Sequence, residues 1–331
     1  MTRTHHRLAA TALVLLAACA APRAARLPLP DESRTDTLAI SALARDLSAD
    51  AMRGRGPWTE ENAAAARRLA TELERLGARP LIGHGLLVPF TAERRPDDTV
   101  HNVIAVLPAR DGSTGGDLVG LTAHFDGLGV GRPDSTGDSI YNGFLDAAVP
   151  TTMVLDIARR YAREPGDRPL LIMLFNLEEQ GLLGSRAFAA RPEAAAAIGR
   201  LQLLIGLDAG SPAGEAMAWQ LMGGSPSHSG AALADSLARI RGWTTTATPP
   251  RAISDVFSFS ERGVPILFPI PGSTWRRYTE AQRADAMRRF DHYHQPADEW
   301  RADFPWSGTA AYADWVWDIV RRATDHRTTL R

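Results

Sequence analysis

The sequence predicts an α/β fold, a three-layer sandwich in which helices cover both faces of a mostly parallel mixed sheet. Short apolar runs of strand length alternate with helical patterns, and this alternation is typical of parallel strands joined by crossover helices. The chain has 331 residues, of which 44% are hydrophobic, so it can bury one sizeable core. The sequence contains no internal repeat and marks no second domain.

Five apolar runs are the predicted strands. In an open α/β sheet the ligand site lies beyond the carboxyl ends of the strands. The side chains that follow each run are therefore the first candidates for a functional site. The runs are residues 102–107, 117–121, 170–175, 201–207 and 264–268.

Three segments are predicted to be helices. Residues 60–77 carry apolar side chains at helical spacing and stop at Gly77. A second helix begins at Pro150 and presents apolar residues on one face. The third spans residues 309–322, and we expect its tryptophans to pack in the core rather than to bind a ligand.

The amino terminus has the features of an export signal. Its apolar run is too short to span a bilayer and is followed directly by Cys19, the only cysteine. Residues 16–19 (LAAC) resemble the lipobox of bacterial lipoproteins, in which the signal is cleaved before an acylated cysteine. The sequence therefore predicts a signal peptide over residues 1–18, a tether over 19–35 and one domain over 36–331.

The predicted location is the periplasmic side of the cell envelope, with membrane attachment only through acylated Cys19. The alternative is an ordinary secretory signal and a secreted protein. Lys and Arg total 37 and Asp and Glu total 38, so no net basic charge predicts a nucleic-acid partner. A single cysteine excludes an intrachain disulfide.

Side chains suited to metal binding follow the predicted strands or precede a predicted helix. Two imidazoles with several carboxylates suit zinc, and zinc sites of this kind need no cysteine. The candidates are His124, Asp126, Asp146, Glu178, Glu179, Asp208 and His294.

Such a set could hold two zinc ions that share one carboxylate. Bound zinc lowers the pKa of water to about 7 and polarises a carbonyl oxygen. A carboxylate without a metal would then act as general base and pass the proton to a leaving amine. Adjacent residues at a strand end point in different directions, so we expect one of Glu178 and Glu179 to bind metal and the other to move protons.

Several segments resemble the zinc-dependent exopeptidase family that contains bacterial leucyl aminopeptidases and glutamate carboxypeptidase-like proteins (peptidase family twenty-eight). The resemblance runs from about Met52 to the carboxyl terminus and keeps the motifs in order. They are His124-x-Asp126, 143–146 (GFLD), 177–185 (LEEQGLLGS), Leu207-Asp208, Ser254-Asp255 and 293–300 (YHQPADEW).

The resemblance implies the zinc-dependent exopeptidase fold, which is phosphorylase/hydrolase-like, and two zinc ions per chain. Asp146 matches the residue that bridges the two ions. His124 and Asp208 match the remaining ligands of one ion, and Glu179 and His294 match those of the other.

Two further residues match family positions that act in the reaction. Glu178 matches the general base, and Asp126 matches a residue that orients the first histidine. The implied activity is that of a lipid-anchored dizinc aminopeptidase acting on a peptide substrate. Asp255 could position the substrate amine or support the metal ligands, or it could cap the helix that follows it.

One segment departs from the aminopeptidase pattern. Residues 146–150 (DAAVP) look more like the Asp-Ser-Ala-Val-Pro of glutaminyl-peptide cyclotransferases, which share the fold, use a single zinc and form N-terminal pyroglutamate. His124 and Asp208 favour the peptidase, as does Tyr293, where the cyclases have Trp. A third alternative is a metal-free receptor on the same fold, and an intact Glu178 argues against it.

Each candidate ligand also has a purely structural interpretation. His124 could be a hydrogen-bonded core histidine, and His294 a surface residue. Asp208 could belong to a turn, and Asp146 could cap a helix. The order of the motifs and their placement at strand ends together favour a site.

Overall fold

The computed structural model describes residues 34–208, 214–224, 229–276 and 279–330. These residues belong to one compact unit, Ser33–Arg331. The predicted signal peptide, Cys19 and the tether up to residue 33 lie outside the described residues. Among the described residues, no helix combines the length and the apolarity that a membrane span requires.

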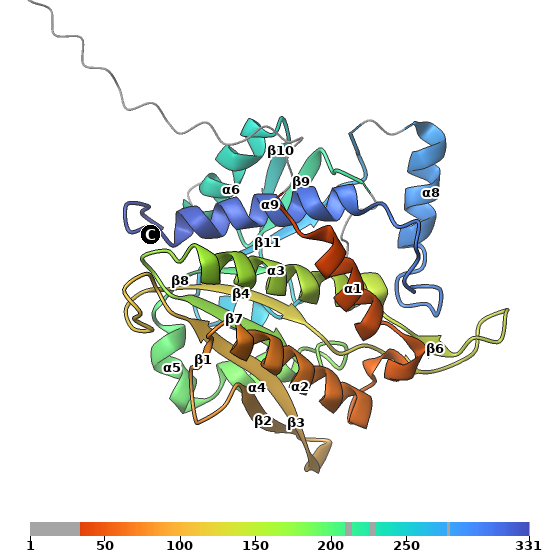
Figure 1. The fold of residues 1–331 in the computed structure, drawn as a ribbon, viewed down its shortest axis with the longest axis horizontal. Coiled ribbons are helices and arrows are strands. Elements are labelled where there is room, and N and C mark those ends of the chain that lie inside the picture. The colour runs from red at the N-terminus through yellow and green to blue at the C-terminus, as the bar shows by residue number, and fades with distance from the viewer. Residues whose placement is uncertain (1–33, 209–213, 225–228, 277–278, 331) are drawn as a thin grey trace, which may run out of the picture. The chain divides into compact units, whose positions relative to one another are not determined.

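A mixed sheet lies at the centre of the molecule (Figure 1). Its described strands are β1 (Arg79–Pro80), β2 (Leu87–Ala92), β3 (Arg95–Leu107), β4 (Leu118–His124), β7 (Leu170–Phe175), β8 (Leu201–Gly206), β9 (Ala218–Met222), β10 (Thr244–Thr248) and β11 (Ile266–Pro271). Their order is β1-β3-β7-β4-β8-β11-β9-β10, and β2 pairs with β3. A separate ribbon joins β5 (Gly129–Val130) to β6 (Ile140–Tyr141).

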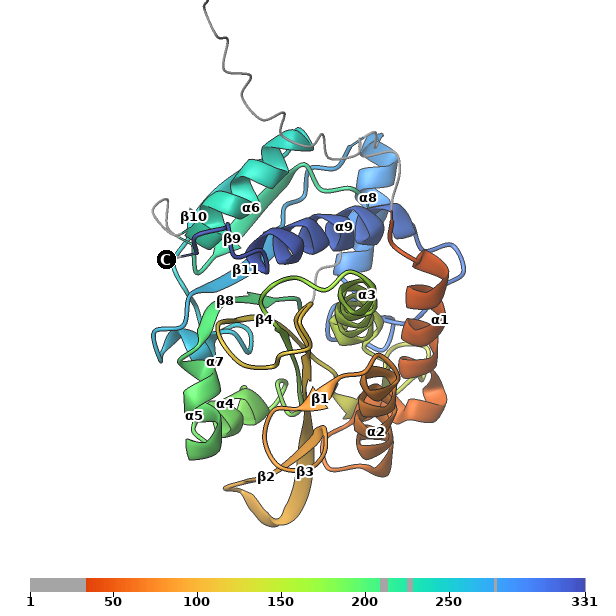
Figure 2. The ribbon, with the colours of Figure 1, turned by 60° about the vertical axis from the view of Figure 1, so that its left-hand side comes forward.

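Helices cover both faces of this sheet (Figure 2). The described helices are α1 (Thr37–Leu47), η1 (Asp50–Arg55), α2 (Glu60–Arg75), η2 (Phe144–Ala148), α3 (Val149–Arg163), α4 (Leu183–Ala189), α5 (Pro192–Ile198), α6 (Ser229–Ile240), α7 (Phe257–Ser260), α8 (Glu280–Phe290) and α9 (Trp306–Ala323). On one face lie α2, α3 and α9, with α1 packed on α3 and α6 packed on α9. The helices α4, α5 and α7 cover the other face. The predicted three-layer α/β fold is therefore confirmed.

The four central strands β7, β4, β8 and β11 are parallel, and they overlap four of the predicted apolar runs. Every residue of β4, β7 and β8 is buried, because helices cover both faces and leave no position for a solvated side chain. His124, the last residue of β4, pairs in register with Phe175, the last residue of β7. The residues that follow these strands therefore emerge at the same edge.

The outer strands are less regular than the sequence predicts. β3 pairs antiparallel with β7 and begins at Arg95 instead of residue 102. β9 also runs antiparallel to β11. The amino half of β3 is polar and exposed, so its residues carry no apolar run that would mark them as a strand. Trp315 and Trp317 of α9 are buried in the core, as predicted.

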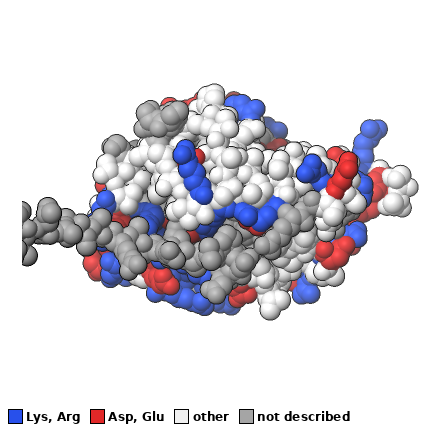
Figure 3. All heavy atoms as spheres, turned by 90° about the horizontal axis from the view of Figure 1, so that it is seen from above, with Lys and Arg blue, Asp and Glu red and all other residues white. Residues whose placement is uncertain are grey.

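Figure 3 shows one face of the molecule, on which uncharged residues occupy the centre. Basic side chains also lie within this uncharged area, and side chains of both signs lie toward its edges. Side chains of both signs are therefore present on the visible part of this face.

Candidate metal centre

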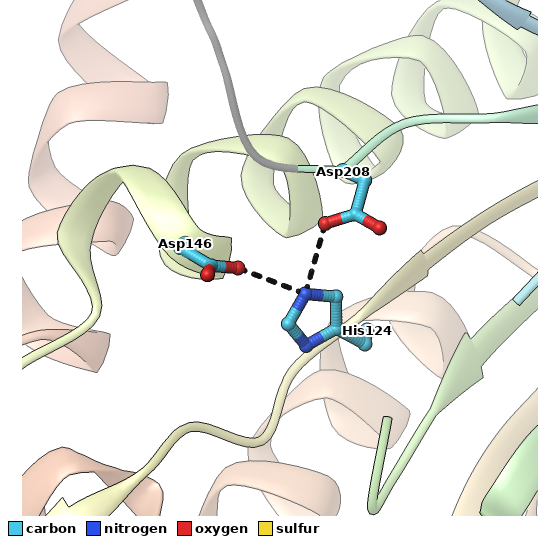
Figure 4. A group of neighbouring side chains, drawn as sticks. All are labelled: His124, Asp146 and Asp208. Carbon is cyan, nitrogen blue, oxygen red and sulfur yellow. Dashed lines mark hydrogen bonds and ion pairs between the residues drawn. The ribbon is translucent and has the colours of Figure 1, made fainter. Parts of the chain in front are cut away.

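One histidine and two carboxylates meet beyond the ends of β4 and β8 (Figure 4). Nε2 of His124 lies 3.0 Å from Oδ1 of Asp146 and 3.1 Å from Oδ1 of Asp208. All three side chains are buried. They can offer a metal ion one nitrogen and two oxygen ligands that lie within 4.8 Å of one another.

A second triad shares Asp146 with the first. Nε2 of His294 lies 3.0 Å from Oδ2 of Asp146 and 3.3 Å from Oε2 of Glu179. The ligand atoms of this second group also lie within 4.8 Å of one another. The two oxygens of the Asp146 carboxylate therefore face two different histidines.

The backbone around Asp146 departs from helical geometry, and the carboxylate of Asp146 points toward the two histidines. Asp146 lies in the π-helical turn η2 with φ −124° and ψ 89°. The helix α3 that follows has Ala148 as its N-cap, and no side chain caps it. The interpretation of Asp146 as a helix cap is therefore wrong.

Asp126 links His124, at the end of β4, to the adjacent residues Glu178 and Glu179, which follow β7. Its Oδ1 accepts the N–H of Glu178 at 3.1 Å, and its Oδ2 accepts the N–H of Glu179 at 3.3 Å. Oδ1 also lies 3.4 Å from Nδ1 of His124. Glu178 and Glu179 therefore have different neighbours. Glu179 belongs to the second triad, whereas the charge of Glu178 raises the pKa of His124.

Residues 102–320 match the family described as Peptidase family M28. The chain belongs to this family. The match confirms the family that the sequence motifs predicted, and it confirms a metallopeptidase as the class of enzyme. No curated protein has a significant sequence match to this M28 chain.

Solved structures share the fold of this M28 chain at low sequence identity. BSAP, a zinc aminopeptidase from Bacillus subtilis, has 15% identity and a TM-score of 0.66, over 90% of this chain and 97% of its own. A leucine aminopeptidase precursor from Bacteroides thetaiotaomicron has 16% identity and a TM-score of 0.63, over 87% and 97%. Porphyromonas gingivalis glutaminyl cyclase has 18% identity and a TM-score of 0.62, over 88% and 100%. The same fold thus occurs in proteins named for both activities that the sequence suggests.

The side chains of the M28 site fit a divalent cation in each triad. Imidazole nitrogens and carboxylate oxygens are ordinary zinc ligands. Oδ2 of Asp146 and Nε2 of His294 are buried and 3.0 Å apart, yet neither makes a hydrogen bond among the described residues. Either a proton on Nε2 or a shared cation would satisfy this buried pair.

Without a metal, the site concentrates negative charge and shifts several pKa values. Burial lowers the pKa of His124, but Asp208 and Glu178 outweigh this effect and raise it well above its usual range. The carboxylates of Asp146 and Glu179 raise the pKa of His294 to about 10. His294 thus holds a proton at neutral pH in the metal-free chain, and a metal ion would have to displace it.

Burial also raises the pKa of Glu178 to about 10, and nearby Asp208 adds to the effect. The pKa of Asp255 rises to about 7, chiefly because this carboxyl is fully buried. Asp255 does not cap α7, whose N-cap is Val256 and which has no side-chain cap. The structure therefore removes the capping alternative for Asp255 and leaves it buried beside the site.

The sequence motifs give no role to two buried charged residues next to the triads, Arg55 and Asp298. Asp298 lies inside the motif 293–300, so the sequence indicated that it is near the site. Arg55 lies in the short helix η1, which has no hydrophobic periodicity, and only its contacts reveal it.

Proposed function

We propose that this chain is an aminopeptidase that binds two zinc ions and hydrolyses the N-terminal peptide bond of a peptide. The observation that carries the proposal is that one carboxylate, Asp146, is shared by two triads. A single-zinc site would need only Asp146, Glu179 and His294. His124 and Asp208, which lie 3.1 Å apart on the other side of Asp146, provide a second complete set of ligands.

Zinc bound in these triads would supply Lewis acidity, which activates water and polarises the scissile carbonyl. Glu178 would take the proton from the attacking water and deliver it to the leaving amine. Its high pKa in the metal-free chain comes from burial and from neighbouring carboxylates. Such an environment favours a carboxyl group that can hold a proton between the two transfers.

We propose Tyr293, whose ring stacks on that of His294 at 3.8 Å, as a hydrogen-bond donor to the substrate. Burial raises the pKa of its hydroxyl, and the charges of Asp146 and Asp208 raise it further. The phenol therefore stays protonated at any working pH. A neutral donor beside the metal ligands can stabilise the negative oxygen that develops when an amide carbonyl is attacked.

The alternative function is that of a single-zinc glutaminyl cyclase. The segment 146–150 favours it, and the glutaminyl cyclase from Porphyromonas gingivalis shares the fold. The two activities differ in product, because a peptidase consumes water whereas a cyclase releases ammonia from an N-terminal glutamine.

A direct test incubates the zinc-loaded chain with leucine p-nitroanilide and, separately, with a glutaminyl peptide. We expect release of nitroaniline and of free N-terminal glutamine. Pyroglutamyl product without anilide hydrolysis would establish the cyclase instead. Loss of both activities in Glu178→Gln, but not in the distant variant Asp36→Asn, would assign the activity to this site.

We further propose that the mature protein is exported and attached to the membrane through acylated Cys19. The support is the sequence LAAC at residues 16–19, which follows a short apolar run. Mass spectrometry of the membrane-extracted protein should show a lipid-modified N-terminal cysteine. Cys19→Ser should move the protein to the soluble exported fraction, and an unmodified membrane-bound variant would contradict the proposal.

A further inference from the structure

Arg55 is a fully buried arginine, and all its hydrogen bonds to described residues go to backbone carbonyls. Its Nε donates to the carbonyl of Phe125 at 2.7 Å, and its Nη1 to those of Leu47 at 2.6 Å and Asn142 at 2.9 Å. Its Nη2 donates to the carbonyl of Gly143 at 2.8 Å. One side chain therefore joins the end of α1, the segment after β4 and the segment before η2.

Asp298 is a buried acid that holds the same η2 segment through its N–H groups. Its carboxylate accepts the N–H of Leu145 at 2.9 Å and that of Asp146 at 3.2 Å. Its backbone carbonyl also accepts the N–H of Phe144 at 3.0 Å. Asp298 thus connects the backbone of Asp146 to the segment that carries His294.

Residues 142–146 therefore lie between a buried guanidinium group and a buried carboxyl group. Arg55 donates to the carbonyls at the start of this segment, and the carboxylate of Asp298 accepts the N–H groups at its end. Gly143 has φ 59°, and a Cβ there would lie 2.9 Å from Nη2 of Arg55 and 2.4 Å from the carbonyl oxygen of Asp146. The segment is packed so closely that only glycine fits this position.

The carbonyl partners of Arg55 lie next to site residues. Phe125 separates His124 from Asp126, and Gly143 is three residues before Asp146. Arg55 thus contacts the backbone that follows His124 at the end of β4 and the backbone that leads into Asp146.

A second buried arginine shows what a purely structural contact of this kind looks like. Arg168 donates to the carbonyls of Ala323 at 2.8 Å, Asp325 at 2.6 Å and Thr328 at 3.3 Å. It precedes the amino end of β7, whereas the site lies beyond the carboxyl end of that strand. Arg168 and Arg55 therefore make the same type of contact at opposite ends of the sheet.

We propose that Arg55 and Asp298 are a positioning pair that holds Asp146 midway between the two histidines and so sets the affinity of both metal positions. Neither residue belongs to a triad. They act through the backbone of residues 142–146. The inference rests on the proposed zinc function, because its consequence is a change in zinc affinity.

The charge of Arg55 also contributes to the pair. Burial lowers its pKa to about 10, and the charges of Asp126, Asp298 and Asp146 oppose that effect. The guanidinium is therefore charged at neutral pH, where it offsets part of the negative charge that gathers around the triads.

The experiment measures zinc dissociation constants of the full chain by chelator competition, together with denaturant unfolding of the metal-free protein. The variants are Arg55→Met, Arg55→Lys, Asp298→Asn and the double variant Arg55→Met/Asp298→Asn. Arg168→Met is the matched control for loss of a buried arginine, and Asp314→Asn is the control for a buried acid that accepts a backbone N–H.

We expect Arg55→Met and Asp298→Asn each to weaken zinc binding about 10- to 100-fold, as other residues that support metal ligands do. Both zinc equivalents should weaken together, because Asp146 belongs to both triads. The double variant should lose less than the product of the single losses, because both residues hold one segment. Arg55→Lys should recover part of the loss, and Arg168→Met should change the dissociation constant less than about twofold while still lowering stability.

Zinc binding that is unchanged in folded Arg55→Met and Asp298→Asn would overturn the proposal, even if both variants are less stable. If Arg55→Met does not fold, Arg55→Lys and Asp298→Asn decide the question by the same criterion. A wild-type chain that binds no zinc would instead overturn the proposed function. The two failures are therefore distinguishable.

Discussion

The carboxylate of Asp126 accepts the backbone N–H of Glu178 at 3.1 Å. The same carboxylate accepts the N–H of Glu179 and lies 3.4 Å from Nδ1 of His124. It therefore fixes both the imidazole at the end of β4 and the backbone of the doublet after β7. The orientation of three proposed functional residues depends on this one buried side chain.

Asp126→Asn should weaken zinc binding about 10- to 100-fold, because one acceptor oxygen is replaced by a donor that faces N–H groups. Chelator competition measures the effect. Asp36→Asn is a suitable control, since Asp36 also accepts a backbone N–H, that of Ala39, at the start of α1. Equal zinc affinity in the wild type and Asp126→Asn would show that this carboxylate does not support the ligands.

Glu178→Gln should lower kcat about 10²- to 10⁴-fold, the usual contribution of a general base, while the zinc content stays near that of the wild type. Glu179→Gln should lose zinc instead, because Glu179 belongs to the second triad. Kinetics and elemental analysis of both variants separate the two roles. A Glu178→Gln variant that loses metal while Glu179→Gln retains it would reverse the assignment.

Zinc binding should release protons at neutral pH. The pKa of His294 is raised to about 10 in the metal-free chain by Asp146 and Glu179, and zinc can bind this imidazole only after its proton leaves. The apparent affinity should therefore rise as the pH increases towards about 10. Calorimetry in two buffers of different ionisation enthalpy counts the protons, and no release at pH 7 would contradict the shift.

The stability of the metal-free chain should follow the opposite trend. A histidine whose folded-state pKa is raised stabilises the fold fully below its ordinary pKa of about 6.5, and this contribution disappears as the pH rises through the folded value. Because the His294 side chain is 39% exposed, the effect should be small. Denaturant unfolding of wild type and His294→Ala should differ more at pH 6 than at pH 10, and an equal difference at both pH values would be inconsistent with the shift.

Trp315→Ala should destabilise the protein by about 3–5 kcal/mol without affecting the zinc affinity of the folded chain. Trp315 is fully buried in α9, its Nε1 donates to the carbonyl of Ala234 at 3.2 Å, and its ring packs edge-on against Trp243 at 5.5 Å. Denaturant unfolding measures the loss. A loss below about 1 kcal/mol would mean that the cluster adapts to the cavity.

The sequence predicts the central part of the fold well, because β4, β7 and β8 are continuous apolar runs covered on both faces. The placement of His124, Asp146, Glu179, Asp208 and His294 in two triads is not derivable from spacing alone. Spacing indicates only which side chains reach one edge of the sheet. The distances among them depend on how the four segments that carry Asp146, Glu179, Asp208 and His294 pack against the end of β4.

Other parts leave weaker signals in the sequence. The polar residues of β3 and the threonines of β10 carry no apolar pattern, although both segments are strands. Arg55 acts through carbonyl groups, which every residue possesses, so no pattern of side chains predicts its contacts. The role proposed for Asp298 likewise depends on backbone N–H groups of a segment 152 residues away.

The most direct test of the account is a crystal structure of the zinc-loaded protein with anomalous scattering measured at the zinc edge. We predict two zinc peaks about 3.5–4 Å apart, as in other two-metal sites, with the Asp146 carboxylate between them. One ion should lie at His124 and Asp208, and the other at Glu179 and His294. A single peak held by Asp146, Glu179 and His294, with His124 still bonded to Asp208, would contradict the two-metal account.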